Sequence, residues 1–303
     1  MQNSESRIEM REVPEPEPAR DEAVVEVRAV SLNRGEVRGL AIAEDGARAG
    51  SDLAGEIVRA AANGSGPAAG TRVVGLVPGG AWAQRVAVTT AWLAPIPEAT
   101  SYAAASTLPV AGLTALFALK MGGLLLGRRV LVTGAAGGVG RFAVQLAARA
   151  GAHVTAVAGS AARAAGLRDL GADAVVLELT REGEPFDLIL ESVGGESLAA
   201  ALSRVAPDGD IISYGNSSRE PASFDATGFY RRAGARLHAF LLLEELTRVA
   251  GSGSRGLRYL AEEVAAGRLD PQIGLEANWR QPGPALAALL DRRVAGKAVL
   301  HVD

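Results

Sequence analysis

A glycine-rich turn between a predicted strand and a predicted helix carries the clearest chemical signal in the chain. It lies within residues 130–160, which read VLVTGAAGGVGRFAVQLAARAGAHVTAVAGS. The N–H groups at the start of a helix, with the helix dipole behind them, bind anions, and glycine lets a diphosphate approach the backbone more closely than a Cβ would permit. The segment therefore predicts a nucleotide-binding βαβ unit.

Gly137 and Gly140 occupy the second and third glycine positions of the G-x-G-x-x-G pattern. Ala135 stands at the first position, directly after Gly134, so one methyl group breaks the strict motif. The flanking strand and helix, followed by a second strand, distinguish a dinucleotide site from an ordinary tight turn, which remains the alternative. We expect the turn to contact the cofactor through Ala135, Ala136, Gly137, Gly138, Val139 and Gly140.

The residues about 20 positions beyond the turn indicate which dinucleotide binds, because sites for NAD usually carry an acid there, on the ribose hydroxyls. This chain has Ala158, Gly159 and Ser160 instead, with Arg163 close behind. Ser160 as a donor and Arg163 as a charge partner suit a ribose 2′-phosphate. NADPH is therefore expected rather than NADH, with a solvated Arg163 at a helix start as the alternative interpretation.

The segments around this unit predict two kinds of architecture. Residues 23–32 alternate apolar and polar side chains, and EIVRAA, TRVVGLV and AQRVAV repeat that pattern between breaks rich in Gly and Pro, which is typical of β-structure. Beyond Pro109, strands and helices alternate from VLVTG to DIISYG, which predicts a parallel sheet. Helices are expected over 141–150, 161–170, 197–205, 255–266 and 284–293, and a last strand over 298–302.

Length and composition limit the class of protein. A chain of 303 residues predicts two domains. Hydrophobic residues make up 48% and charged residues 21%, as in ordinary globular proteins, and the net charge of -3 gives no attraction to nucleic acid or anionic membranes. The absence of cysteine removes disulfides, thiolate nucleophiles and zinc sites built on sulfur. A small-molecule substrate is the partner that remains.

Two segments raise the question of a secretory signal or a membrane span, and both lack the required pattern. The first 12 residues are polar and charged, so a cytoplasmic protein is expected. Residues 99–119 are uncharged over a length that approaches a membrane span, but they contain several hydroxyl side chains and a central Pro109. We expect a loop followed by a buried helix there.

A series of short stretches, taken in order, resembles the medium-chain dehydrogenase/reductase superfamily, in its zinc-free quinone oxidoreductase-like and enoyl reductase-like branch. The stretches are EVRAVSLNRGEVR, GSDLAGEIV, GTRVVGL with GAWAQRVAV, LPVAGLTA, GAAGGVG, LGAD, FDLILESVGG and GKAVL. The resemblance covers nearly the whole chain. It implies an α/β fold with a GroES-like β-rich catalytic domain over 1–106 and 243–303, a Rossmann doubly wound parallel sheet over 107–242, and an active site in the cleft.

The resemblance also implies the metal content and further cofactor contacts. In the zinc alcohol dehydrogenases of the superfamily, a cysteine lies where this chain has Asn33, and a histidine and its glutamate lie where it has Ser51 and Asp52. Serine does not replace imidazole as a zinc ligand, so no metal is expected. The remaining cofactor contacts are expected at Thr114, Val193, Gly194, Gly195, Gly215, Asn216 and Phe240.

Departures from the family pattern suggest the catalytic candidates. LNRGE places Arg34 and Glu36 where the family more commonly has a small or aromatic residue and Asp. Arg34 either polarises a substrate carbonyl or pairs with Glu36, and Asn33 either donates to the substrate oxygen or shapes a turn. Glu178 occupies a position where quinone oxidoreductases often have a tyrosine near the adenosine, and a carboxylate there could repel a 2′-phosphate. Relatives that use a tyrosine acid have it earlier than Tyr102, so no proton donor is assigned.

These observations together predict a zinc-independent, NADPH-dependent oxidoreductase that transfers hydride to a quinone, an enone or a similar activated carbonyl or alkene. An enoyl-thioester reductase and a non-catalytic NADPH-binding or sensing protein are the alternatives. Family members dimerise through edge strands, so a homodimer joined at DIISYG is expected. The three histidines and Lys297 are interpreted as structural.

Overall fold

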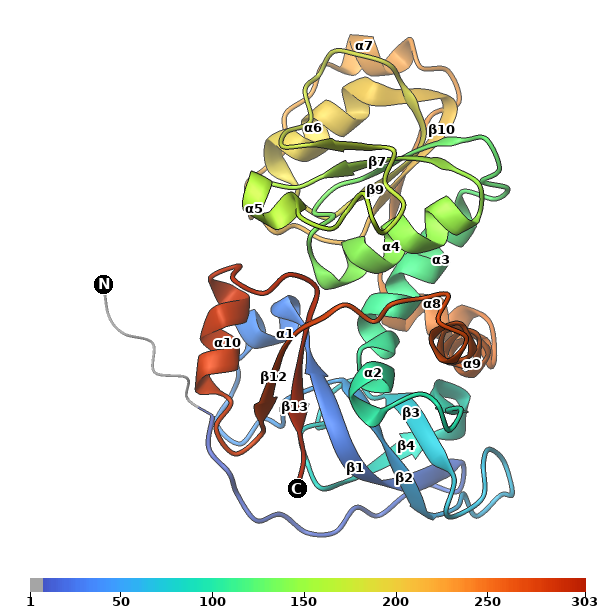
Figure 1. Ribbon diagram of the computed structural model, residues 1–303, viewed down its shortest axis with the longest axis vertical. Coiled ribbons are helices and arrows are strands. Elements are labelled where there is room, and N and C mark those ends of the chain that lie inside the picture. The colour runs from blue at the N-terminus through green and yellow to red at the C-terminus, as the bar shows by residue number, and fades with distance from the viewer. Residues whose placement is uncertain (1–7) are drawn as a thin grey trace. The chain divides into compact units, whose positions relative to one another are not determined.

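The computed structural model describes residues 8–303 (Figure 1). The polar N-terminus and the start of the first domain fall partly on residues 1–7, outside the described residues. The chain divides into two compact units. Unit 1 comprises Met1–Leu113 with Leu246–Asp303, and unit 2 comprises Thr114–Glu245. Both divisions lie a few residues after the boundaries that the sequence suggests.

Within the described residues, a 7-stranded sheet forms the frame of unit 1, in the order β12-β13-β1-β2-β3-β5, with β4 paired to β1. Strand β1 is its centre, because it pairs antiparallel with β13, β2 and β4. The last strand of the chain thus lies against the first. The strands are β1 (Glu22–Leu32), β2 (Asp52–Arg59), β3 (Arg72–Leu76), β4 (Arg85–Thr89), β5 (Leu93–Pro95), β12 (Ile273–Asn278) and β13 (Lys297–His301).

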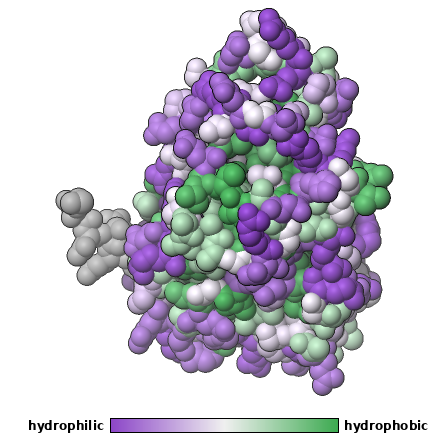
Figure 2. Space-filling model, turned by 45° about the horizontal axis from the view of Figure 1, so that its top comes forward, coloured by the Kyte–Doolittle hydropathy of each residue, from purple (hydrophilic) through white to green (hydrophobic). Residues whose placement is uncertain are grey.

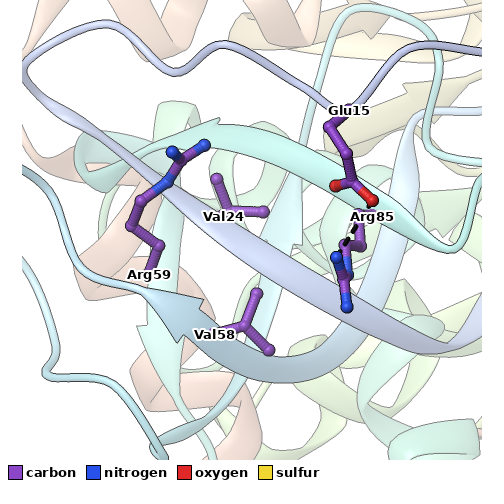
Figure 3. A pocket seen from close by; sticks show the side chains of 5 residues that line it. All are labelled: Glu15, Val24, Val58, Arg59 and Arg85. Carbon is purple, nitrogen blue, oxygen red and sulfur yellow. Dashed lines mark hydrogen bonds and ion pairs between the residues drawn. The ribbon is translucent and has the colours of Figure 1, made fainter.

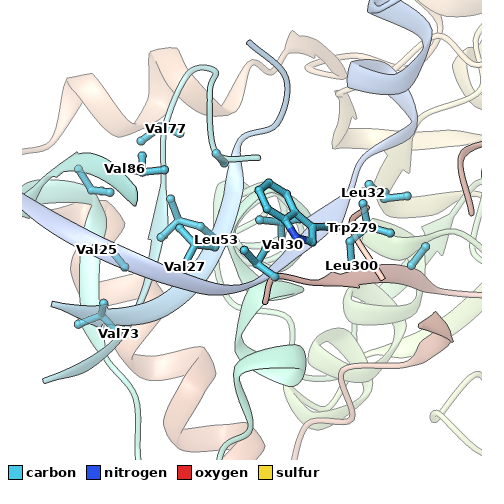
Figure 4. Close-up of a cluster of buried hydrophobic side chains, with 14 of the residues drawn as sticks. Val25, Val27, Val30, Leu32, Leu53, Val73, Val77, Val86, Trp279 and Leu300 are labelled. Atoms are coloured by element: carbon cyan, nitrogen blue, oxygen red, sulfur yellow. The ribbon is translucent and has the colours of Figure 1, made fainter. Parts of the chain in front are cut away.

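The core of unit 1 collects apolar side chains from this sheet (Figure 4). Val25, Val27 and Leu53 are fully or almost fully buried, and Trp279 packs in the same cluster. Each such aliphatic side chain contributes about 1.5–3 kcal/mol on burial. The Trp279 indole N–H donates to Asp303 Oδ1 at 2.8 Å, so its polar end is satisfied.

The uncharged segment 99–119 differs from the expected loop and helix. It forms α2 (Tyr102–Ser106), the π-helical turn η2 (Leu108–Gly112) and most of α3 (Leu113–Met121) in direct succession. The Ser101 hydroxyl caps α2 by accepting from the Ala104 amide, and Pro109 lies at the start of η2, where an N–H group is not required. No helix within residues 8–303 is long and apolar enough to cross a membrane.

Unit 2 contains a parallel sheet in the order β11-β10-β9-β6-β7-β8. Counted from β6, this is the order 3-2-1-4-5-6 of the doubly wound Rossmann fold, which confirms the predicted fold class. Its strands are β6 (Arg129–Val132), β7 (His153–Val157), β8 (Ala174–Val176), β9 (Phe186–Glu191), β10 (Val205–Ser213) and β11 (Arg236–Ala239). Its helices include α4 (Gly138–Arg149), α5 (Ala161–Ala164), α6 (Gly195–Arg204) and α7 (Ala226–Tyr230).

Two expectations for unit 2 are corrected. The helix expected over 161–170 ends at Ala164, because Ala165 is extended (ψ 134) and Gly166 has a φ of +77. DIISYG is not an edge strand, because β11 pairs with β10 on its outer side. The sequence of β11, RLHA, is too short and too polar to be recognised as a strand from its pattern.

The remaining helices belong mainly to unit 1 or lie at the division between the units. They are α1 (Arg34–Gly39), η1 (Thr90–Trp92), α8 (Leu242–Arg248), α9 (Ser252–Ala265) and α10 (Gly283–Leu290). On the face drawn in Figure 2, apolar patches alternate with polar surface. Among the exposed large apolar side chains, Leu124 and Leu126 lie in the loop between α3 and β6. Scattered residues of this kind are normal on protein surfaces.

Candidate functional site

The phosphate-binding turn follows β6 directly and ends at the first residue of α4. Gly137 precedes the helix, with a φ of -83, and has no side chain to cap it. The first amides of a helix have no intrahelical partner, so those of α4 are available to an anion. A Cβ added at Gly140 would lie 2.5 Å from Ala135 Cα and 2.6 Å from the Gly134 oxygen. Gly140 therefore lets α4 pack directly on the turn.

The structure explains how the turn forms although Ala135 replaces the first glycine of the motif. Gly134 has a φ of +58, in the left-handed region that favours glycine, and a Cβ there would meet the Ser192 hydroxyl at 2.6 Å. Ala135 is buried, and its N–H donates to the Val157 oxygen at 3.0 Å. The glycine required for the tight turn is thus shifted by one residue along the chain.

The other predicted cofactor residues gather at the same edge of the sheet. Ser160 and Arg163 follow β7, Val193, Gly194 and Gly195 follow β9, Gly215 and Asn216 follow β10, and Phe240 follows β11. All lie beyond the carboxyl ends of parallel strands, where open α/β sheets bind their ligands. Thr114, in the first turn of α3, is the exception. The structure therefore brings together most of the residues expected to hold a dinucleotide.

Glu191, which the sequence analysis did not single out, shapes the loop after β9. Its carboxylate is fully buried and accepts from the amides of Val193 at 2.9 Å and Gly194 at 3.1 Å, and from the Ser197 hydroxyl at 3.0 Å. The only signal in the sequence is an acidic residue at the end of a buried apolar run. Glu191 holds the loop in place, and both of its oxygens already accept hydrogen bonds within the chain.

Arg141 is a second residue that the sequence analysis did not assign. Its Nε donates to the Ala136 oxygen at 3.4 Å and its Nη2 to the Ala165 oxygen at 2.8 Å. The buried guanidinium thus links the phosphate turn to the end of α5. Ser160 caps α5 by accepting from the Arg163 amide, and the guanidinium of Arg163 lies over Gly159.

Unit 1 contains a buried polar network built on Asp52. Its Oδ2 accepts from the Ser31 hydroxyl at 2.6 Å, from Asn33 Nδ2 at 2.7 Å and from Lys297 Nζ at 3.3 Å. Its Oδ1 accepts from the Val110 amide in η2 at 2.8 Å. The Asp52 and Lys297 side chains are 0% and 3% exposed. Lys297 thus compensates a carboxylate that would be very unfavourable without a partner.

The side-chain amide of Asn33 makes its hydrogen bonds within the chain. It precedes α1 but does not cap it. Its amide nitrogen donates to Asp52 and to Glu36 Oε1, the latter at 3.2 Å, and its oxygen accepts from Lys297 at 2.7 Å. Both amide hydrogens and the oxygen therefore have intramolecular partners.

Arg34 and Glu36 lie on α1 but have different surroundings. Arg34 Nη2 donates to the Leu290 oxygen at the end of α10, at 2.9 Å. Glu36 points to the Asp52 network, and burial, with a smaller contribution from the Asp52 charge, raises its pKa to about 7. The Ser51 hydroxyl, the Lys297 charge and the Asn33 amide offset part of that increase.

A pocket on the strands of unit 1 is separate from these groups. It has a volume of about 440 Å³ and is lined by Glu15, Val24, Val58, Arg59 and Arg85 (Figure 3). Arg85 pairs with Glu15 at 2.9 Å, and Arg59 donates to the Pro16 oxygen at 2.9 Å. Because none of the candidate residues lines this pocket, we do not assign the chemistry to it.

A Rossmann unit with a glycine turn, joined to a β-rich unit built from both ends of the chain, defines a two-domain nucleotide-binding protein. Residues 138–245 match the family described as zinc-binding dehydrogenase. The chloroplastic quinone-oxidoreductase QR1 of Triphysaria versicolor is 30% identical over 318 residues, covering 96% of this chain and 92% of that protein. The chain therefore belongs to the medium-chain dehydrogenase/reductase superfamily, in its quinone oxidoreductase-like branch.

Two further similarities have different extents. The spectinabilin polyketide synthase system protein NorB of Streptomyces orinoci is 36% identical over 290 residues, and this chain spans 13% of its length. The structure of the quinone oxidoreductase from Coxiella burnetii has a TM-score of 0.78 and 25% identity, covering 96% of this chain and 93% of that one. A segment similar in sequence to this chain thus lies within a much longer protein, whereas the match to the Coxiella burnetii structure covers nearly all of both chains.

The description of the matching family raises the question of whether the network of unit 1 fits zinc. Zn²⁺ is bound by thiolate, neutral imidazole or carboxylate groups. Here the Lys297 ammonium lies 2.7 Å from Asn33 Oδ1 and 3.3 Å from Asp52 Oδ2. A fixed positive charge within the donor set does not fit a divalent cation, so we derive no chemistry through zinc.

Proposed function

We propose that the chain is an NADPH-dependent reductase that works without zinc and acts on a small quinone, an enone or a similar activated carbonyl or alkene. The observation that carries this proposal is the glycine turn at the carboxyl end of β6, followed after β7 by Ser160 and Arg163 where an acid would select NAD. The bound cofactor would supply a hydride. The residues of the chain would bind and orient the cofactor and provide the proton that the substrate takes up.

Each group of residues has a proposed part in binding. Ala135, Ala136 and Gly137 form the turn, and the first amides of α4, from Gly138 to Gly140, hold the diphosphate. Ser160 and Arg163 hold the 2′-phosphate. The exposed Glu178 lies beyond β8. The nicotinamide half is bound by Thr114, Val193, Gly194, Gly195, Gly215, Asn216 and Phe240.

The test is oxidation of NADPH by the purified protein with a panel of quinones, enones and 2-enoyl thioesters, combined with calorimetry of NADPH binding. Turnover of quinones or enones supports the proposal. The 36% identity to a polyketide synthase protein over 91% of the chain favours enoyl thioesters as the second candidate substrate class. Binding without turnover of any acceptor would support a sensing role instead, and absence of binding would contradict both.

Removal of the Arg163 guanidinium is expected to weaken NADPH binding selectively. A hydrogen bond to a charged group contributes about 1.5–3 kcal/mol, which corresponds to a loss of about 10- to 100-fold in affinity. Calorimetry of Arg163→Ala is expected to show this loss for NADPH and no change for NADH. Arg168→Ala, an exposed arginine beyond α5, is the matched control. Equal losses for both cofactors would contradict the 2′-phosphate assignment.

Removal of the Arg34 guanidinium is expected to lower kcat/KM about 10-fold or more if it stabilises charge on the substrate oxygen. Steady-state kinetics of Arg34→Ala measure this effect, with Arg38→Ala on the same helix as the control. Unchanged kinetics would contradict this role and leave Arg34 with a structural one, such as its hydrogen bond to the Leu290 oxygen.

We also propose a homodimer. β11 is the edge strand of the unit 2 sheet, so its outer side offers unpaired backbone groups to a second copy. Analytical ultracentrifugation tests this, and a monomer at micromolar concentration would contradict it.

A further inference from the structure

The network around Asp52 is saturated with hydrogen bonds. Asp52 accepts from four groups, namely the Ser31 hydroxyl, the Asn33 amide, the Lys297 ammonium and the Val110 amide. The Lys297 ammonium, which has three hydrogens, donates to Asp52, to Asn33 Oδ1 and to the Leu32 oxygen. Asp52 and Lys297 therefore use their hydrogen-bonding capacity within the chain.

Glu36 is the exception in this neighbourhood. Its Oε1 accepts from Asn33, whereas its Oε2 is buried and has no hydrogen-bond partner of normal geometry among the described residues. A buried carboxylate oxygen without a donor is costly, especially beside the charge of Asp52. A protonated carboxyl group instead carries an O–H, and the Ser51 hydroxyl is a neighbouring group that can interact with it.

The charges around Glu36 agree with the protonated form. The charged side chains that act on Glu36 are Asp52 on β2 and Lys297 on β13, and their opposite charges partly cancel. The α10 helix, which packs against α1, carries no acidic or basic residue within Gly283–Leu290. Burial is the largest effect and raises the pKa of Glu36 to about 7, so the group holds and releases a proton near neutral pH.

We propose that Glu36 is the catalytic acid of the reductase and donates its Oε2 proton to the substrate. This inference rests on the proposed function. Asn33 is then a positioning residue, because its amide fixes Oε1 and leaves Oε2 as the oxygen that carries the proton. The sequence offered no tyrosine for this step, and Glu36 fills that gap with a group already built into the network.

For an enone or enoyl thioester, the reduction balances as follows. Bound NADPH would supply the hydride that forms a C–H bond at the β-carbon, while the C=C π bond breaks and its electron pair moves toward the carbonyl. The Glu36 O–H bond breaks, and the proton forms the second C–H bond at the α-carbon. The products are the saturated carbonyl compound, NADP⁺ and the Glu36 carboxylate, which regains a proton from water.

The test uses the full chain with Glu36→Gln, which preserves the shape of the side chain and can accept the Asn33 hydrogen bond but cannot donate a proton. Removing a general acid typically costs about 10²- to 10⁴-fold, so kcat is expected to fall by that factor with unchanged NADPH affinity. Glu36→Asp is expected to restore part of the rate. Glu44→Gln, an exposed site beyond α1, is the matched control and should match the wild type.

The pH dependence separates an acid from a merely structural residue. The acid must be protonated, so wild-type kcat is expected to be highest below pH 7 and to fall as pH rises through the pKa of about 7. This decrease of kcat with rising pH is expected to be absent in Glu36→Gln. In D₂O, the wild type should place deuterium on one face of the α-carbon, and Glu36→Gln should lose that selectivity.

A readout independent of turnover is the infrared signal of a protonated carboxyl group. The signal is expected at pH 6 in the wild type, to disappear toward pH 8, and to be absent at both values in Glu36→Gln. An active wild type with an equally active Glu36→Gln variant, or with no such signal, would overturn the acid role alone. A wild type that binds NADPH but reduces no acceptor would contradict the proposed function and the acid role with it.

Discussion

Lys297→Met is expected to lower the free energy of unfolding of unit 1 by about 3–5 kcal/mol, because it leaves the Asp52 charge buried and unpaired. The Asp52 side chain is 0% exposed, and the Lys297 ammonium is the one positive charge within hydrogen-bonding distance of it among the described groups. Methionine fills much of the volume of lysine. The loss of stability is therefore caused mainly by removal of the positive charge and only to a small extent by a cavity. The three tryptophans, Trp82, Trp92 and Trp279, all lie in unit 1, so denaturation followed by fluorescence measures this unit.

Two variants test the electrostatic explanation. Lys120→Met replaces the other lysine of the chain, which is exposed on α3, and should change stability by less than about 0.5 kcal/mol. Lys297→Met combined with Asp52→Asn removes both charges, and should be less destabilised than the sum of the single variants. A loss below about 1 kcal/mol for Lys297→Met would mean that Asp52 is not held as a charged group.

The parallel sheet of unit 2 could be predicted from the sequence because its signals are local. Strands β6 to β9 are short segments rich in apolar residues, and the glycines of the turn before α4 mark it in the sequence. Even there, the sequence assigned the first glycine position to Ala135, whereas Gly134 adopts the left-handed backbone. A motif fixes which residue types are present, but the φ angle of each depends on packing against Ser192, which is distant in sequence.

The network of unit 1 could be predicted only in part, because its members come from distant parts of the chain. Asn33 and Glu36 follow β1, Asp52 begins β2, and Lys297 begins β13. The antiparallel pairing of β1 with β2 and β13 brings them together, and that pairing has no signature in any single segment. The sequence alone therefore indicates a structural role for Lys297 but not its partners. It shows Glu36 as a departure from the family pattern, but not the burial that raises its pKa.

Gly140→Ala is expected to destabilise unit 2 and to weaken NADPH binding together. The added methyl group would lie 2.5–2.8 Å from backbone atoms of Gly134 and Ala135, which cannot move aside as a flexible side chain would. Overpacking of this kind costs about 1–3 kcal/mol, and the turn must shift to relieve it. Circular dichroism during thermal unfolding measures the stability, and calorimetry measures an expected loss of about 10-fold or more in NADPH affinity.

Gly137→Ala separates the two effects, because a Cβ there meets no atom closer than the Gly134 oxygen at 3.4 Å, and the φ of -83 suits alanine. The fold is therefore expected to keep its stability. The methyl group would nevertheless stand at the start of α4, where a diphosphate has to approach the backbone, so NADPH affinity is expected to fall as in Gly140→Ala. Because the added methyl group fits the fold, it can weaken NADPH binding only by contacting the ligand. If Gly137→Ala binds NADPH as tightly as the wild type, the diphosphate does not bind at this turn.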